Sequence, residues 1–329
     1  MCSSSQPSSG LLTPKSHKAA DVDTSALSIR DIFRQNPRQR LFVKPLQWTD
    51  CHPELLGCKF FYQSCSQQPS SPPLSPGQPP FISSSTAQES DYPLEMAVRV
   101  LGRGSSYLFK QIVLAEMLEQ SPMAIRKTRE ALLFCYEKKQ YIRMPCTVFS
   151  GRPPSHPNFF DIPMIAYLDH EDLRRDRRAC WRPVTISDPS RDPYLVALLI
   201  ALAQSQRRNL KRARKGTRKG TRGPAATNFQ VHVFLGDALD KTRLLVYTAE
   251  IPVAALDRLA DFRWIPQNPT GFVVHTTEVP FEPYLTFLER LLQATFPNVA
   301  QVSPALPPRK RRRSSEASPV ESFKVARVK

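Results

Sequence analysis

The sequence predicts a single mixed domain of the α/β or α+β class, in which a small sheet packs on a central buried helix between disordered tails. Three observations predict this fold. A strongly apolar helical stretch lies at residues 192–203, strand-like and helical segments alternate after it, and the prolines cluster outside the periodic segments. With 329 residues the chain could hold two domains, but 32 prolines against 11 glycines favour one domain with long flexible flanks.

The central helix has a clear start and no polar face. Asp192 is a good N-cap, and Pro193 suits the first helical position, where a missing N–H costs nothing. Six large aliphatic residues between positions 195 and 202 cover every side of the helix, so it belongs in the middle of a core. Their burial would contribute roughly 9–18 kcal/mol of gross hydrophobic stabilisation. The stretch is shorter than the roughly 20 apolar residues that cross a bilayer, so we expect no membrane association.

The segment before the folded domain contains short helical and aromatic patterns. We expect it to dock either on the chain's own domain or on a partner. The predicted division of the chain is a disordered leader (1–24), this docking segment (25–62), a linker rich in Ser, Pro and Gln (63–91), the folded domain (92–299) with a basic insertion (207–222), and a disordered basic tail (300–329).

Ahead of the central helix, the domain is predicted to contain two helices and two short strands. Trp181 is expected to anchor the charged connection that follows them to the core. The elements in order are a helix over 107–119 with Leu108, Ile112, Ala115 and Leu118 on its inner face, a helix over 121–139, strands over 142–149 and 162–168, and the connection over 170–182.

Beyond the central helix, the pattern is strand, strand, helix, strand, helix. The first two strands are expected to pair antiparallel across a seven-residue connection. The elements in order are strands over 229–235 and 243–251, a helix from Pro252, a strand over 272–277, and a last helix from Pro283 with Tyr284, Leu288, Leu291, Leu292 and Thr295 as its inner stripe.

The formal charge of +17 is concentrated in two short segments. Residues 207–222 carry nine Lys or Arg and no acid, and residues 309–313 carry five more. Without these fourteen, the chain has 32 basic and 29 acidic residues, which is nearly neutral. This distribution is typical of a protein with basic arms and not of one with a cationic active-site cleft.

The first basic segment is predicted to be a loop that binds nucleic acid or another polyanion, such as an acidic protein. Flexible Lys and Arg side chains can follow phosphates and release counterions without reading sequence. No aromatic residue interleaves with them, so stacking on single-stranded bases is not indicated. The alternative is a solvated insertion without a partner. The predicted phosphate-contacting residues are Arg207, Arg208, Lys211, Arg212, Arg214, Lys215, Arg218, Lys219 and Arg222.

The second basic segment follows two prolines and resembles a nuclear import signal for an acidic import receptor. We therefore expect a nuclear protein. The first ten residues are rich in Ser and lack an apolar core, which argues against a secretory signal. Seven cysteines without a Cys-x-x-Cys pair favour reduced thiols in an intracellular compartment. The import residues are Arg309, Lys310, Arg311, Arg312 and Arg313.

Enzyme chemistry has weaker support, and we expect neither metal nor cofactor. Cys51, Cys58 and Cys65, with His52, lack the paired spacing of zinc ligands. The element order resembles the core of PD-(D/E)xK nucleases, active or degenerate. In that alternative, Asp237 and Glu250 would supply the metal-binding carboxylates, and Lys241 would replace a lysine that is missing two residues after Glu250. The main hypothesis is a non-enzymatic nuclear protein that binds nucleic acid or another polyanion. The nuclease is its first alternative, and a protein-interaction scaffold is its second.

Two sequence blocks carry a family resemblance. Residues 192–204 (DPYLVALLIALAQ) and 245–252 (LVYTAEIP) resemble those of a family of uncharacterised proteins from filamentous ascomycete fungi. The resemblance covers roughly residues 93–297 and rests on aliphatic core positions. It implies a shared fold and a fungal source, and it implies no catalytic residue or cofactor.

Overall fold

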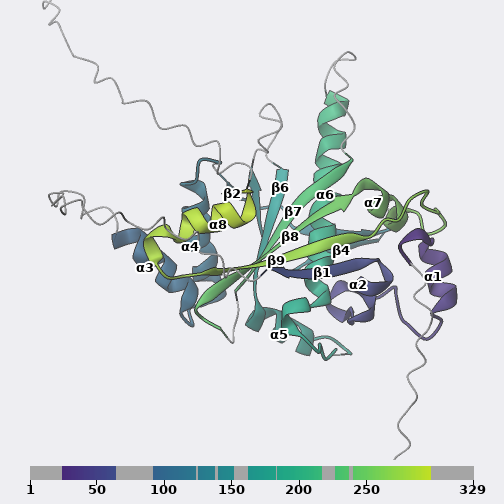
Figure 1. Ribbon diagram of the computed structural model, residues 1–329, viewed down its shortest axis with the longest axis horizontal. Coiled ribbons are helices and arrows are strands. Elements are labelled where there is room, and N and C mark those ends of the chain that lie inside the picture. The colour runs from purple at the N-terminus through teal and green to yellow at the C-terminus, as the bar shows by residue number, and fades with distance from the viewer. Residues whose placement is uncertain are drawn as a thin grey trace, which may run out of the picture.

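The protein is an α/β fold built on a seven-stranded mixed sheet, as the computed structural model shows (Figure 1). The sequence-based fold class is therefore confirmed, although the sheet is larger than the small one expected. The predicted leader, linker and basic tail fall almost wholly outside the residues that the structure describes, which are 24–63, 92–123, 125–137, 140–151, 162–182, 184–216, 227–236 and 240–297.

The sheet mixes parallel and antiparallel neighbours. Only the pairs β1–β9 and β6–β7 are parallel among its described strands. In sheet order the strands are β1 (Cys58–Gln63), β9 (Phe272–Pro280), β8 (Arg243–Pro252), β7 (Asn228–Gly236), β6 (Ile162–Asp169), β5 (Thr147–Gly151) and β2 (Arg126–Lys127), and a separate hairpin is formed by β3 (Leu132–Tyr136) and β4 (Gln140–Met144).

Eight α-helices within the described ranges surround the sheet. Four shorter 3-10 helices lie at Thr24–Ala26, Pro45–Gln47, Pro189–Arg191 and Tyr284–Thr286. The α-helices are α1 (Ile29–Gln35), α2 (Cys51–Leu55), α3 (Tyr92–Gly102), α4 (Tyr107–Glu119), α5 (His170–Arg178), α6 (Pro193–Gly216), α7 (Val253–Ala260) and α8 (Phe287–Thr295).

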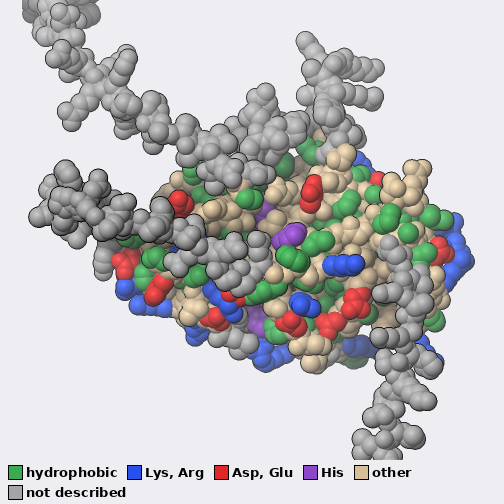
Figure 2. Space-filling model, viewed as in Figure 1, with side chains coloured by type: hydrophobic (Ala, Val, Ile, Leu, Met, Phe, Trp, Pro, Cys, Tyr) green, Lys and Arg blue, Asp and Glu red, His purple; other side chains and the backbone are tan. Residues whose placement is uncertain are grey.

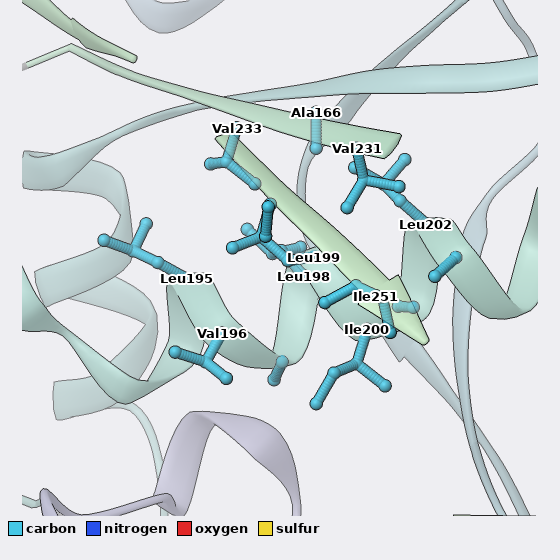
Figure 3. Close-up of a cluster of buried hydrophobic side chains, with 14 of the residues drawn as sticks. Ala166, Leu195, Val196, Leu198, Leu199, Ile200, Leu202, Val231, Val233 and Ile251 are labelled. Carbon is cyan, nitrogen blue, oxygen red and sulfur yellow. The ribbon is translucent and has the colours of Figure 1, made fainter. Parts of the chain in front are cut away.

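Helix α6 forms the centre of the larger core, as its apolar sequence predicts. Asp192 caps it, because the Asp192 Oδ1 atom accepts a hydrogen bond of 2.8 Å from the backbone N–H of Tyr194. Every residue from Tyr194 to Ala203 is at most 1% exposed. Figure 3 shows Leu198, Leu199 and Leu202 beside the strand residues Val231, Val233 and Ile251, which belong to the same buried cluster.

The N-terminal segment, residues 24–63, shares with the β3–β4 hairpin the side of α6 that the sheet leaves free. The buried Trp48 belongs to the same apolar cluster as α6 and donates a hydrogen bond of 3.0 Å from its indole Nε1 to the hydroxyl of Tyr136 on β3. Strand β1 then pairs in parallel with β9, so this segment supplies one edge of the sheet. The folded unit therefore includes residues well before position 92. A helix that is apolar on every side must be buried on every side. The sheet packs on one side of α6, and residues 24–63 supply part of the packing on the other.

Helices α3, α4 and α8 pack on the opposite face of the sheet and close a second core. Strand β8 shows how the two cores share one strand. Leu244 and Val246 face the second core, while Leu245 and Tyr247 face α6. This alternation follows from the two-residue repeat of a β-strand. No helix within the described segments is long and apolar enough to span a membrane.

Four local predictions are wrong. The single strand expected over 142–149 is two strands, β4 and β5, which belong to different sheets. Residues 121–139 form no α-helix in their described part, because β2 and the strand β3 occupy that stretch. The connection at 170–182 contains helix α5, and Trp181 is 91% exposed instead of anchoring the segment. Helix α4 has the predicted bounds, but Leu108 and Ile112 are exposed, while the polar Lys110 is buried.

Candidate polyanion interface

The basic segment begins as a helix and not as the loop that the sequence predicted. Helix α6 continues without interruption to Gly216, so the first ten residues of the segment belong to it. We call residues 207–216 the basic end of α6. It projects from the body of the domain in Figure 1. Leu210 still packs against the larger core, and the six residues beyond it extend the helix by about 9 Å.

Two buried glutamines, which lie in α6 immediately before the basic end, hydrogen-bond the helix to neighbouring strands. Gln204 Oε1 accepts a hydrogen bond from the backbone N–H of Cys135, and Gln204 Nε2 donates to the carbonyl of the same residue. Gln206 Nε2 donates to the carbonyls of Pro163 on β6 and Gln230 on β7, at 2.8 and 2.9 Å. The basic end therefore starts from a rigid base.

The first two predicted phosphate-contacting residues also hold the helix in place. Arg207 forms an ion pair with Asp257 on α7. Arg208 donates a hydrogen bond of 3.4 Å from Nη2 to the carbonyl of Leu133, and partial burial lowers the pKa of its guanidinium. An arginine stays protonated in proteins, so both side chains remain charged while they anchor the helix, although the charge of Arg207 is paired with that of Asp257.

Lys211 and Arg212 are the next two basic residues of the helix, and both are exposed. With 100° per residue, positions 207, 208, 211 and 212 fall within about 140° of the helix circumference. The helix therefore presents one basic side, on which like charges four residues apart repel one another. The side chains of Arg214 and Lys215, and all of Arg218, Lys219 and Arg222, lie outside what the structure describes, as do the predicted import residues 309–313.

The rest of the domain surface has mixed charge. On the face shown in Figure 2, acidic and basic side chains are interspersed among apolar and neutral ones. This agrees with the near balance of 32 basic and 29 acidic residues outside the two basic segments. The structure thus separates a nearly neutral body from a projecting cationic helix end.

The nuclease-like candidates do not assemble in the described structure. Lys241 precedes β8 and Glu250 lies near the other end of that strand, so about 30 Å of extended chain separates them. Glu250 is exposed and accepts a hydrogen bond of 2.7 Å from the side-chain amide of Asn228. Asp237 lies outside the described residues. Lys241 and Glu250 therefore cannot act on one metal ion.

The cysteine and histidine residues near the N-terminus serve the fold. His52 Nδ1 accepts a hydrogen bond of 2.9 Å from the Thr49 N–H, which places the ring proton on Nε2, 3.1 Å from the Arg40 carbonyl. Burial lowers the pKa of His52 and raises the pKa of the Cys58 thiol to about 12. Cys65 falls outside the described ranges, and within those ranges no group of three His, Cys, Asp or Glu side chains could hold a metal.

Sequence inspection missed two buried ion pairs. Lys110 on α4 lies 2.6 Å from Asp169 at the end of β6, and Arg177 on α5 lies 2.5 Å from Asp192. Asp169 also caps α5, because its Oδ1 atom accepts a hydrogen bond from the Glu171 N–H. A helical interpretation of residues 170–178 would have placed Arg177 on the buried side of a short helix. Lys110 gave no signal, because a lysine within a helix is usually exposed.

In comparisons with known proteins, no family model matches the chain, and no curated protein is significantly similar to it. The geometry therefore carries the functional argument.

Proposed function

We propose that the protein is a non-enzymatic nuclear protein that binds nucleic acid through the basic end of α6. One observation supports the proposal. A helix whose basic positions share one side projects from a body of nearly balanced charge. Cationic side chains in this arrangement can neutralise successive phosphates of a polyanion. The basic residues that follow in the sequence up to position 222 would extend the same contact.

The helix geometry favours double-stranded nucleic acid as the partner. An α-helix fits the major groove of B-form DNA, and a rigid helix end loses less conformational freedom on binding than a flexible loop. The contacts would be to phosphates, so we expect little preference for base sequence. An acidic protein surface is the alternative polyanion, and a scaffold that binds partners through the domain surface remains the competing function.

The test is binding of the full chain to a labelled DNA duplex across a salt series. Six to nine phosphate contacts would give a slope of about −5 to −8 for log affinity against log salt. The variant K211A/R212A removes two exposed charges beyond the anchoring pair Arg207 and Arg208. It should weaken binding and reduce the magnitude of the slope by about 2.

The matched control is K59A/R263A, which also removes one exposed lysine and one exposed arginine, but from β1 and from the turn after α7, both far from α6 in the sequence. It should leave affinity and slope close to those of the unchanged chain. Equal effects of the two variants would overturn the proposal. Binding that survives both high salt and K211A/R212A would favour the scaffold function.

A further inference from the structure

A second cationic site lies near the opposite end of α6. It is a cavity of about 470 Å³ between α5 and the segment 184–192, which we call the α5 pocket. The ion pair between Arg177 and Asp192 ties α5 to the start of α6. Because α6 has 24 residues, about 36 Å of helix separates its two ends. The α5 pocket is therefore independent of the basic end of α6.

Four basic residues of α5 line the α5 pocket. His170, Arg174, Arg177 and Arg178 are spaced at i, i+4, i+7 and i+8, which places them on one side of the helix. Asp192 is the only acid that lines the pocket among the described residues. Since Arg177 already pairs with Asp192, the guanidinium groups of Arg174 and Arg178 give the pocket a net positive charge.

These two exposed arginines lack strong partners. The described contacts of Arg174 include only a 3.7 Å ion pair with the exposed Glu171, and no ion pair of Arg178 is found in that part of the chain. Deeper in the pocket wall, His170 Nδ1 and Arg177 Nε are buried without a hydrogen-bond partner among the described atoms. Like charges four residues apart destabilise a helix, and a bound anion would offset that repulsion.

The remaining wall is partly apolar. Leu173, Val184 and Ile186 line the cavity beside the cationic side, and the exposed Thr185 adds a hydroxyl group. Planar guanidinium groups bind phosphate through paired N–H donors, whereas an apolar wall binds the organic part of a ligand. Inorganic phosphate would use only one of these two surfaces.

We propose that the α5 pocket binds a small organic phosphate. Arg174 and Arg178 would hold the phosphate, Thr185 would donate a hydrogen bond to it, and the apolar wall would cover the organic group. The pocket is too small for a nucleic-acid duplex, so its ligand is a small molecule and not the polyanion of the basic end of α6.

The test measures affinity of the full chain for phenyl phosphate, inorganic phosphate and benzyl alcohol by calorimetry. Phenyl phosphate should bind most tightly because it alone matches both surfaces. The variant R174A/R178A should lower its affinity about 10-fold or more, and R174K/R178K should restore part of the loss. T185V should cause a smaller loss, because it removes a single neutral donor.

The control R38A/R263A removes two exposed arginines from turns outside α5 and should leave the affinity unchanged. The variant K211A/R212A should also leave it unchanged, which separates this site from the basic end of α6. The proposal is overturned if phenyl phosphate does not bind, if it binds no better than benzyl alcohol, or if R174A/R178A and R38A/R263A behave alike. Circular dichroism of each variant verifies that a loss of affinity is not a loss of fold.

Discussion

Residues 193–206 of α6 and the basic end at 207–216 form one continuous helix, but they stand in different surroundings. Apart from the half-buried Ser205, the first part is buried, between the sheet on one side and the segment 24–63 with the β3–β4 hairpin on the other. The second part projects from the body and contains no acidic residue of its own. Packing stabilises the first part, whereas the second depends on its continuity with the first. A short cationic helix can thus be held rigid by a buried extension of itself.

The largest expected effect lies in the buried part. Leu199→Ala should reduce the free energy of unfolding by about 3–5 kcal/mol, because it removes a fully buried side chain and leaves a cavity. Leu210→Ala, at the partly buried position within the basic end, should cost clearly less. Urea denaturation of both variants measures the difference. Equal losses would show that the helix is packed alike along its length.

Lowering the pH should destabilise the buried core, whereas the Lys and Arg side chains of the basic end should keep their charge. His232 on β7 is fully buried, and this burial lowers its pKa to about 3. The unfolded chain, with a pKa near 6.5, binds more protons between these values, so stability falls as the pH falls through this window. From pH 7 to pH 4 the loss from this residue should be about 3 kcal/mol.

The measurement is the unfolding free energy against pH for the unchanged chain and for His232→Gln. The variant should lose less stability between pH 7 and pH 4, because it lacks the titrating ring. If His232→Gln does not fold, NMR titration of the unchanged chain still decides the point. An imidazole that protonates near pH 6 would contradict its burial.

Loss of the hydrogen bonds of Gln206 should reduce the free energy of unfolding by an intermediate amount. Gln206→Leu removes the hydrogen bonds to the carbonyls of Pro163 and Gln230, and it should cost about 2 kcal/mol because those acceptors stay buried. Gln230→Ala is the matched control, since this side chain is exposed on β7. Thermal unfolding distinguishes the two. A neutral Gln206→Leu would mean that the basic end has no rigid base.

Much of the fold could be predicted from the sequence because its core segments have strong periodic patterns. The central helix, its Asp192 cap and the antiparallel pair β7–β8 were all expected. The segment 132–136 was assigned to a helix, although its apolar residues suit a strand equally well, because short apolar runs do not decide between the two. The parallel pairing of β1 with β9 joins residues more than 200 positions apart, and no local pattern encodes such a contact.

The candidate site was predictable in composition but not in shape. Nine basic residues without an acid were visible, yet the helix to Gly216 was not, because the repeated glycines suggested a loop. The pairing of Arg207 with Asp257 depends on where α7 packs, which only the tertiary structure shows. The α5 pocket was missed for a different reason. Its four basic residues share a face only if residues 170–178 are helical, and their charge had suggested a connection.

The smallest expected changes in stability distinguish two arginines within the basic end of α6. Arg207→Ala should cost about 0.5–1 kcal/mol, because it removes a half-buried ion pair with Asp257 and exposes part of α7. Arg212→Ala should change stability by no more than about 0.5 kcal/mol, because the side chain is exposed and its loss relieves repulsion with Arg208. Both should weaken duplex binding. Urea denaturation and duplex titration of the two variants thus separate anchoring from ligand contact, and if Arg212→Ala were as destabilising as Arg207→Ala, the basic end would be part of the packed fold and not a projecting arm.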